Sequence, residues 1–193
     1  MLFNVNNSQF AICELRIIVY ICFMKSHNGM RPHDIVVLLK IISLKDKWLN
    51  KDLSIGLNIS QSEISESLNR SAIAGLISPD KKKVFKSALL KFIEYGLAYV
   101  FPAEPGGMER GIPTAHSAPI LKDIIVSHED YVWPYANGKV RGQAILPLYP
   151  NQVYAVLQDE KLYNMLALTD SIRVGKVREK DKAVDLLKKH FDQ

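Results

Sequence analysis

This chain is poor in cysteine: its 193 residues contain two, Cys13 and Cys22. Both lie near the amino terminus, which excludes a disulfide framework or a cysteine-based zinc site in the rest of the sequence. Long apolar runs are also missing. Within the apolar stretch Phe10–Met24 the longest uncharged run is Ile17–Met24, whereas a transmembrane helix needs about 20 residues. We therefore expect a cytoplasmic protein with no membrane contact and no bound metal.

Catalytic signatures are absent from the sequence as well. It contains no nucleophile elbow, metalloprotease helix, phosphate-binding loop or dinucleotide-binding glycine pattern. The pairs worth weighing are His116 beside Ser117 and His128 beside Glu129. Neighbouring side chains diverge along an extended chain, so they do not reach one another as a nucleophile and its base must. We expect no enzymatic activity and no cofactor.

The chain does contain enough apolar sequence for a core and an uneven distribution of charge. Apolar residues make up 48% and the net charge is +5, which is not the composition of a disordered chain. Residues 31–100 hold 11 basic and 7 acidic residues, whereas residues 101–193 hold 12 of each. The excess is densest around Lys81, Lys82, Lys83 and Lys86, opposed by Asp80. This favours a polyanionic partner, although a solvated turn explains Lys81–Lys83 equally well when taken alone.

We divide the chain into three regions. Residues 1–29 are an extension, or a start assigned too early, with Met24 or Met30 as alternatives to Met1. Residues 30–101 show helical periodicity. Residues 102–193 begin with a segment rich in proline and aromatic residues and end in helices: residues 102–150 hold seven of the nine prolines. So aromatic a segment indicates ordered structure and not a tether.

Three helices are predicted in the second region. The first begins at Pro32, has one apolar stripe of Ile35, Leu38, Leu39 and Ile42, and ends near Lys45. The second is short and is capped by Asn50. It ends at Asn58, which tolerates the left-handed conformation of a tight turn. The third, about residues 60–74, starts with a capping box in which the Ser60 hydroxyl and the Glu63 carboxylate bond reciprocally.

The stretch DLSIGLNISQSEISESLNRSAIAGLI resembles the winged helix-turn-helix regulators of the MarR and Lrp types. The resemblance covers about 50 residues and rests on a capped turn between two short helices and on the glycine exit. The matching positions are Leu53, Leu57, Ile59, Ser60, Ile64, Leu68 and Gly75-Leu76-Ile77. It implies a mainly α fold with a three-helix, winged-helix-like DNA-binding domain.

A helical wheel divides the third helix into two sides. Ile64, Leu68, Ala72 and Gly75 point inward on this wheel, and the polar residues point outward. In the family this outward side enters the major groove, where Asn, Arg and Ser contact bases or phosphates. The resemblance thus implies base or backbone contacts from Ser60, Gln61, Ser62, Ser65, Glu66, Asn69 and Arg70, with phosphate contacts from Lys81, Lys82, Lys83 and Lys86. A merely solvated polar face remains the alternative for each residue alone.

The sequence departs from the family after this helix. Val84–Val100 has helical spacing where a β-hairpin wing is usual, so the wing is reduced or replaced by a helix. Further on, Asn137-Gly138 predicts a type I′ hairpin, and Ser117 is a candidate cap for a helix over residues 120–126. Asp159 is predicted to cap a helix ending near Val174, followed by a last helix through Phe191. His116, Trp133, Tyr135 and Arg141 either line an effector or partner pocket or are buried in their own core, and burial is favoured.

Two functions follow from these patterns. The first is a sequence-specific DNA-binding transcriptional regulator, which the family implies to be a homodimer on double-stranded DNA, with the carboxyl-terminal helices as its contact surface and an effector that the sequence does not identify. The second is a winged-helix protein-interaction module, such as an antitoxin or an accessory partner of a neighbouring gene product.

Overall fold

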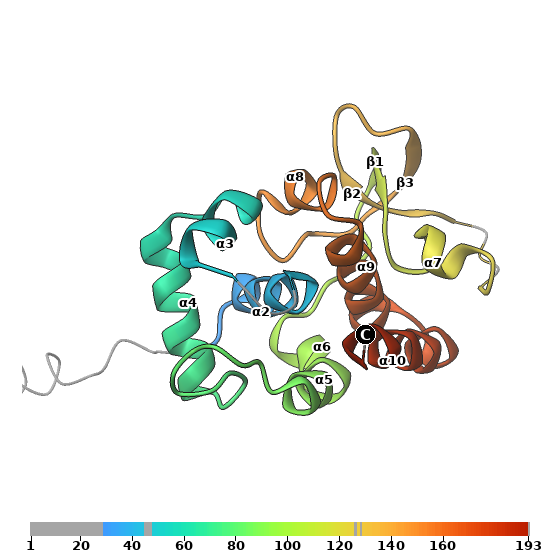
Figure 1. The fold of residues 1–193 in the computed structure, drawn as a ribbon. Helices are drawn as coiled ribbons and strands as arrows, with labels where there is room; N and C mark the ends of the chain where they lie inside the picture. The colour runs from blue at the N-terminus through green and yellow to red at the C-terminus, as the bar shows by residue number, and fades with distance from the viewer. Residues whose placement is uncertain (1–28, 45–47, 126, 128, 193) are drawn as a thin grey trace, which may run out of the picture.

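The computed structural model describes residues 29–44, 48–125, 127 and 129–192. The predicted extension with Cys13 and Cys22, and the predicted helix end at Lys45, lie outside these residues. The described chain is mainly helical with one small three-stranded sheet (Figure 1). In this described part, no helix combines the length and the apolar character that crossing a bilayer requires.

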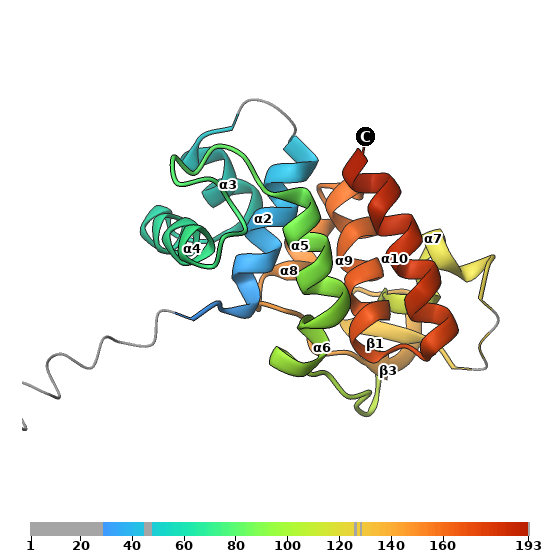
Figure 2. The same cartoon turned by 90° about the horizontal axis from the view of Figure 1, so that it is seen from below.

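Helix α2 (Pro32–Leu44) lies at the centre of the fold. It begins at Pro32, as predicted, but it is buried on every side from Asp34 to Ile41 and not along one stripe. Val36 and Val37, which fall outside the predicted stripe, are fully buried. The reason is that α2 contacts α3 and α4 on one side and α9 on the other (Figure 2).

Helices α3 (Asn50–Leu57) and α4 (Gln61–Ile73) follow the predicted short-helix, turn and helix order. Both end in the same way, with a left-handed residue whose successor bonds back to the helix. At Asn58 (φ 51°) the Ile59 N–H reaches the Ser54 carbonyl, and at Gly75 (φ 70°) the Leu76 N–H reaches the Ser71 carbonyl. One detail was wrong: Asn50 is the first residue of α3 and not its cap.

The segment after α4 forms a minimal ladder before the chain turns helical again. Ile77 and Val84 pair as an antiparallel bridge around a turn over residues 78–83. Helices α5 (Lys86–Tyr95) and α6 (Leu97–Val100) then occupy the predicted helical stretch, interrupted at Gly96. The prediction of a helix after the turn is therefore confirmed.

A small closed sheet fills the region after α6. Strands β1 (Met108–Pro113), β2 (Tyr131–Pro134) and β3 (Val140–Ala144) each pair with the other two. The predicted type I′ hairpin at Asn137-Gly138 is wrong, because β2 and β3 are parallel and Gly138 has no positive φ. A glycine is still required there, since a Cβ at residue 138 would overlap the Gly111 backbone.

Between β1 and β2 the chain forms the 3₁₀ helix η1 (Ala115–Ser117) and helix α7 (Pro119–Lys122). Ser117 does not cap α7, whose first turn follows Ala118. Its hydroxyl instead accepts a hydrogen bond from the Tyr131 N–H at 2.8 Å. The serine therefore joins η1 to β2.

Three helices complete the chain: α8 (Gln152–Val156), α9 (Glu160–Val174) and α10 (Val177–Asp192). Asp159 caps α9 as predicted, accepting from the Leu162 N–H at 3.0 Å. Its other oxygen accepts from Lys40 Nζ and Ser43 Oγ of α2, each at 2.7 Å. Helices α5, α9 and α10 lie side by side (Figure 2), and one apolar core continues through both predicted regions, 30–101 and 102–193.

Candidate nucleic-acid interface

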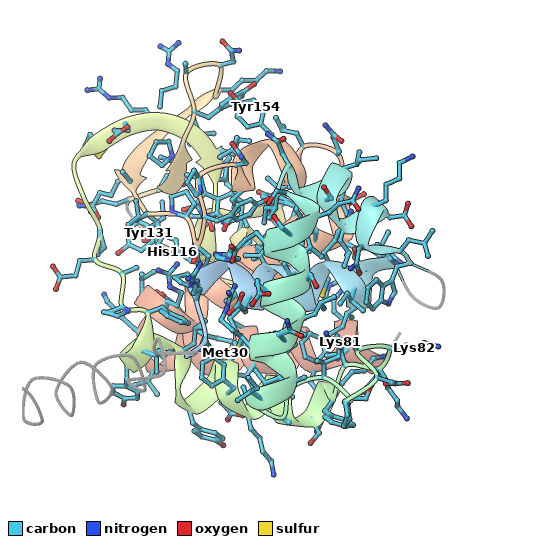
Figure 3. All side chains as sticks on the ribbon, turned by 90° about the vertical axis from the view of Figure 1, so that its left-hand side faces the viewer. Met30, Lys81, Lys82, His116, Tyr131 and Tyr154 are labelled. Atoms are coloured by element: carbon cyan, nitrogen blue, oxygen red, sulfur yellow. The ribbon has the colours of Figure 1, made fainter. Side chains whose placement is uncertain are left out.

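None of the described residues covers the outward side of α4. Gln61, Ser62 and Glu66 are exposed, and Ser65 and Asn69 are partly exposed. Their hydrogen bonds are local: Asn69 Nδ2 donates to Glu66 at 3.4 Å, and Ser62 pairs with the cap residue Ser60 at 3.1 Å. Seen from the side of α4, this helix lies in front of the other elements, with Lys81 and Lys82 beside it (Figure 3). The carboxyl-terminal helices lie behind it and leave this side free.

Arg70 is the predicted contact that the structure contradicts. It does not point outward but is 7% exposed and faces α2. Its Nε and Nη2 donate to the two oxygens of the fully buried Asp34, at 2.9 and 2.7 Å. The helical wheel failed because α4 buries a wider arc than its apolar stripe: the small residues Ser67 and Ser71 are also buried, and their size lets α4 lie close to its neighbours.

Arg70 belongs to an ionic network that fixes α4 against α2. Its Nη2 also donates to Glu63 Oε1 at 2.7 Å, and His33 Nε2 lies 2.9 Å from the same oxygen. The Glu63 carboxylate is thus committed to this network, so the reciprocal half of the predicted capping box is replaced, whereas the Ser60 half is present at 3.3 Å. Burial opposes ionisation of Glu63, but the hydrogen bonds from Arg70 and His33 outweigh it and lower its pKa.

The basic turn over residues 78–83 projects beside α4. Lys81 has a left-handed backbone (φ 60°), and the Ser78 hydroxyl accepts from the Lys83 N–H at 2.9 Å. Lys82 and Lys83 are exposed, and the side chains of Lys81–Lys83 form no ion pair among the described residues. Lys86 differs, because its Nζ donates to the Phe191 carbonyl of α10. The prediction that Lys86 contacts phosphate is therefore weakened.

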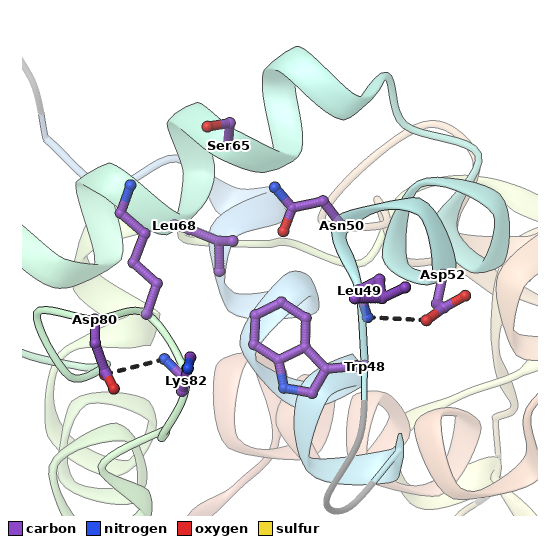
Figure 4. A pocket seen from close by; sticks show the side chains of 9 residues that line it. Trp48, Leu49, Asn50, Asp52, Ser65, Leu68, Asp80 and Lys82 are labelled. Atoms are coloured by element: carbon purple, nitrogen blue, oxygen red, sulfur yellow. Dashed lines mark hydrogen bonds between the residues drawn. The ribbon is translucent and has the colours of Figure 1, made fainter.

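A groove separates α4 from this turn. It has a volume of about 830 Å³, and the indole of Trp48 and the Leu68 side chain supply its apolar surface (Figure 4). Asn50, Ser65 and Lys82 stand around it, with Asp80 accepting from the Lys82 N–H at 3.3 Å. Trp48 and Asn50 were not predicted as site residues, because they lie on α3 and its approach, whereas contacts were expected from α4 and the basic turn.

The four residues proposed for an effector or partner pocket do not form one pocket, because Trp133 and His116 are buried whereas Arg141 is exposed. Trp133 is fully buried and donates its Nε1–H to Asp170 at 2.6 Å, and His116 is 5% exposed. Tyr135 contacts the Tyr154 ring edge-on at a centroid distance of 6.1 Å, and Arg141 is exposed on β3. Burial in their own core, the favoured alternative, is confirmed for Trp133 and His116.

Asp170 of α9 joins the sheet region to the helices. Besides Trp133, its carboxylate accepts from the Thr114 hydroxyl at 3.0 Å and from Arg173 Nη1 at 2.7 Å. Burial raises the pKa of Asp170, and these donors oppose that rise. Arg173 in turn donates to the Phe101 and Leu146 carbonyls. The cluster therefore fixes irregular segments and offers no open site for a ligand.

His116 makes a second link between the sheet region and the helices. Its Nε2 lies 2.8 Å from the Glu129 carbonyl and its ring packs on Tyr131 at a centroid distance of 4.4 Å. Its Nδ1 lies 3.9 Å from Glu179 of α10 and has no hydrogen-bond partner among the described residues. No cluster of metal-ligating side chains occurs in the ranges that the structure describes.

Comparisons of the chain with family models, with curated proteins and with solved structures find no match.

Proposed function

We propose that this protein is a DNA-binding transcriptional regulator of the winged-helix type, with α4 as its recognition helix. The observation that supports this most is the uncovered polar side of α4 next to the unpaired lysines of the 78–83 turn. An α-helix fits the major groove, and the side chains of Asn69 and Gln61 are of the types that bond adenine edges there. Ser62 and Ser65 suit bases or phosphates.

The turn over residues 78–83 supplies the phosphate contacts in this proposal. Its ladder is reduced to the Ile77–Val84 pair, so it is a shortened wing. Contacts from Lys81, Lys82 and Lys83 give affinity that falls with salt but carry no sequence choice. Glu66 opposes binding unless it accepts from a cytosine amine.

Arg70 has a different role from that of a base contact. Held by Asp34 and Glu63, it sets the rotation of α4 about its own axis and so decides which side chains face outward. Since one helix reads few base pairs, we propose that two copies bind paired half-sites.

The test is fluorescence anisotropy with a labelled duplex from the region upstream of the protein's own gene, repeated over a salt series. Replacing Lys81, Lys82 and Lys83 by Gln should make the negative slope of log K against log salt shallower by about 2 to 3. Asn69→Ala should weaken the specific duplex about 5- to 150-fold and leave a scrambled duplex nearly unaffected.

A matched control removes the same charge from α10, with Lys180, Lys182 and Lys188 replaced by Gln. This control should bind as the wild type does. Absence of binding at low salt, or equal losses in the two triple variants, would contradict the proposal.

The interaction-module alternative has its own support in the exposed side chains of Tyr95, Tyr99 and Val100, which are 68, 86 and 52% exposed on α5 and α6. Co-purification with a neighbouring gene product that persists in the Lys81–Lys83 variant, without nucleic acid, would favour it.

A further inference from the structure

Two arginines stand directly opposite each other on neighbouring strands of the small sheet. Arg110 of β1 and Arg141 of β3 are register partners, and both are exposed. The Cβ atoms of opposed residues lie about 4.5–5.5 Å apart on the same face, and like charges placed there destabilise a sheet. Neither guanidinium has a carboxylate partner in the described part of the chain. The arrangement has a cost that an anion would remove.

Backbone geometry fixes both arginines on the outside. Each is followed by a glycine, Gly111 or Gly142, that is buried against another strand. A Cβ on Gly111 would overlap the Trp133 carbonyl, and one on Gly142 would overlap the Asp130 carbonyl. Because successive side chains of a strand point to opposite faces, the close approach of each glycine turns its arginine outward.

An aromatic pair lies next to Arg110 on the side of β1 that pairs with β2. The Tyr135 N–H donates to the Arg110 carbonyl at 2.9 Å, which extends the β1–β2 register of Gly111 and Pro134 by one residue. Arg141, Arg110 and Tyr135 therefore follow one another across the sheet. Tyr135 meets Tyr154 of α8 edge-on, and Tyr154 is 54% exposed, so one ring of the aromatic pair is open to solvent.

We propose that this row binds a nucleotide unit, with its phosphate held by Arg110 and Arg141 and its base stacked on the Tyr135–Tyr154 pair. Two planar guanidinium groups suit the bidentate recognition of phosphate oxygens. Tyrosine rings stack on any base, as in proteins that bind single strands. The same chemistry is presented by a free nucleotide and by a strand of single-stranded nucleic acid. The site lies on the small sheet, away from α4 (Figure 1), and does not depend on the duplex proposal.

The test uses the full chain and three probes: AMP, ribose 5-phosphate and a labelled ten-residue oligothymidylate. Calorimetry with AMP and anisotropy with the oligonucleotide should both report binding, and ribose 5-phosphate should bind at least fivefold more weakly than AMP. Tighter binding of the oligonucleotide than of AMP identifies a strand as the ligand, and the reverse identifies a free nucleotide.

Variants separate the two parts of the site. Replacing Arg110 and Arg141 by Gln should reduce binding of both nucleotide probes at least tenfold, and replacing both by Lys should retain part of it because the charge remains. Tyr154→Leu should weaken the oligonucleotide about 5- to 150-fold. The matched control, Lys176→Gln just before α10 combined with Arg178→Gln within it, should have no effect.

Three outcomes would overturn the proposal: no binding of AMP or oligothymidylate by the wild type, equal binding of AMP and ribose 5-phosphate, or equal losses in the arginine variant and its α10 control. Loss of duplex binding alone in the arginine variant would likewise overturn it, since the row would then be a duplex backbone contact. The Lys81–Lys83 variant should keep its affinity for AMP, so failure of either proposal is seen separately.

Discussion

Two buried ionic clusters join parts of this molecule, and they differ in how far apart their charged residues lie in the sequence. Asp34 and Arg70 lie 36 residues apart and join two regular helices, α2 and α4. Asp170 and Arg173 lie on one turn of α9. Asp170 accepts hydrogen bonds from Trp133 of β2 and from Thr114, which precedes η1. Arg173 donates to the backbone carbonyls of Phe101 and Leu146. The first cluster orients an element, whereas the second anchors segments that have little regular structure of their own. Removing a charge from the first cluster should therefore affect the orientation of α4, whereas removing one from the second should affect the attachment of the irregular segments.

The largest effect is expected from Arg70→Ala. The substitution leaves Asp34 buried without its partner, and breaking such a pair costs about 3–5 kcal/mol of the free energy of unfolding. Urea denaturation measures it. Because Arg70 positions α4, the duplex affinity should also fall under conditions where the variant is still folded. A loss below 1 kcal/mol would mean that Arg70 is not held as described.

Trp133→Phe tests the second cluster with a smaller change. The substitution keeps one aromatic ring but removes the five-membered ring with the Nε1–H that donates to Asp170, so the lost hydrogen bond costs about 1–3 kcal/mol and the cavity adds to it. Since Trp133 lies far from α4 in the fold, duplex affinity per folded molecule should not change. Parallel loss of affinity would contradict the separation of the two regions.

The pH dependence of stability sharpens the comparison. The lowered pKa of Glu63 gives stability that is present above its ordinary value of 4.5 and is lost as the pH falls through the lowered pKa. Glu63→Gln should therefore flatten the decline of the free energy of unfolding at acidic pH, measured by urea titrations at a series of pH values. An unchanged acid profile would show that Glu63 is not ionically held.

The smallest effect concerns backbone strain beside the second cluster. Ala115 has φ 51°, a region that costs a residue with a Cβ about 1–2 kcal/mol. Ala115→Gly removes this cost, but it adds conformational entropy to the unfolded chain and deletes a fully buried methyl, so it should destabilise by about 1–2 kcal/mol less than the same change at the equally buried Ala118. Thermal denaturation measures it, with Ala118→Gly, at an ordinary φ, as the control that should destabilise more.

Much of the helical architecture was predictable, because caps, turns and apolar periodicity are local signals. Ser60, Asn58, Gly75 and Asp159 each mark a boundary where the sequence predicted one. The orientation of Arg70 was not predictable, since its partner Asp34 lies in another helix and a wheel describes only the helix itself. The wheel correctly predicted that Ser62, Glu66 and Asn69 face outward, because their hydrogen bonds stay within α4 and its cap.

The small sheet was harder to predict because long-range backbone contacts define it. Asn137-Gly138 has the composition of a hairpin turn, but the glycine is needed for close approach to Gly111 and not for a positive φ. The two Arg–Gly dipeptides, at residues 110–111 and 141–142, were the available signal. In each of these dipeptides an exposed arginine precedes a buried glycine, and the two strands that contain them, β1 and β3, pair with each other.

The double engagement of Asp159 has a mechanical consequence. One of its oxygens starts α9 and the other ties that helix to Lys40 on α2. A rotation of α9 against α2 would break a helix cap and an ion pair in the same step. Asp159 therefore couples α9 to α2, and the Asp34–Arg70 pair couples α2 to α4.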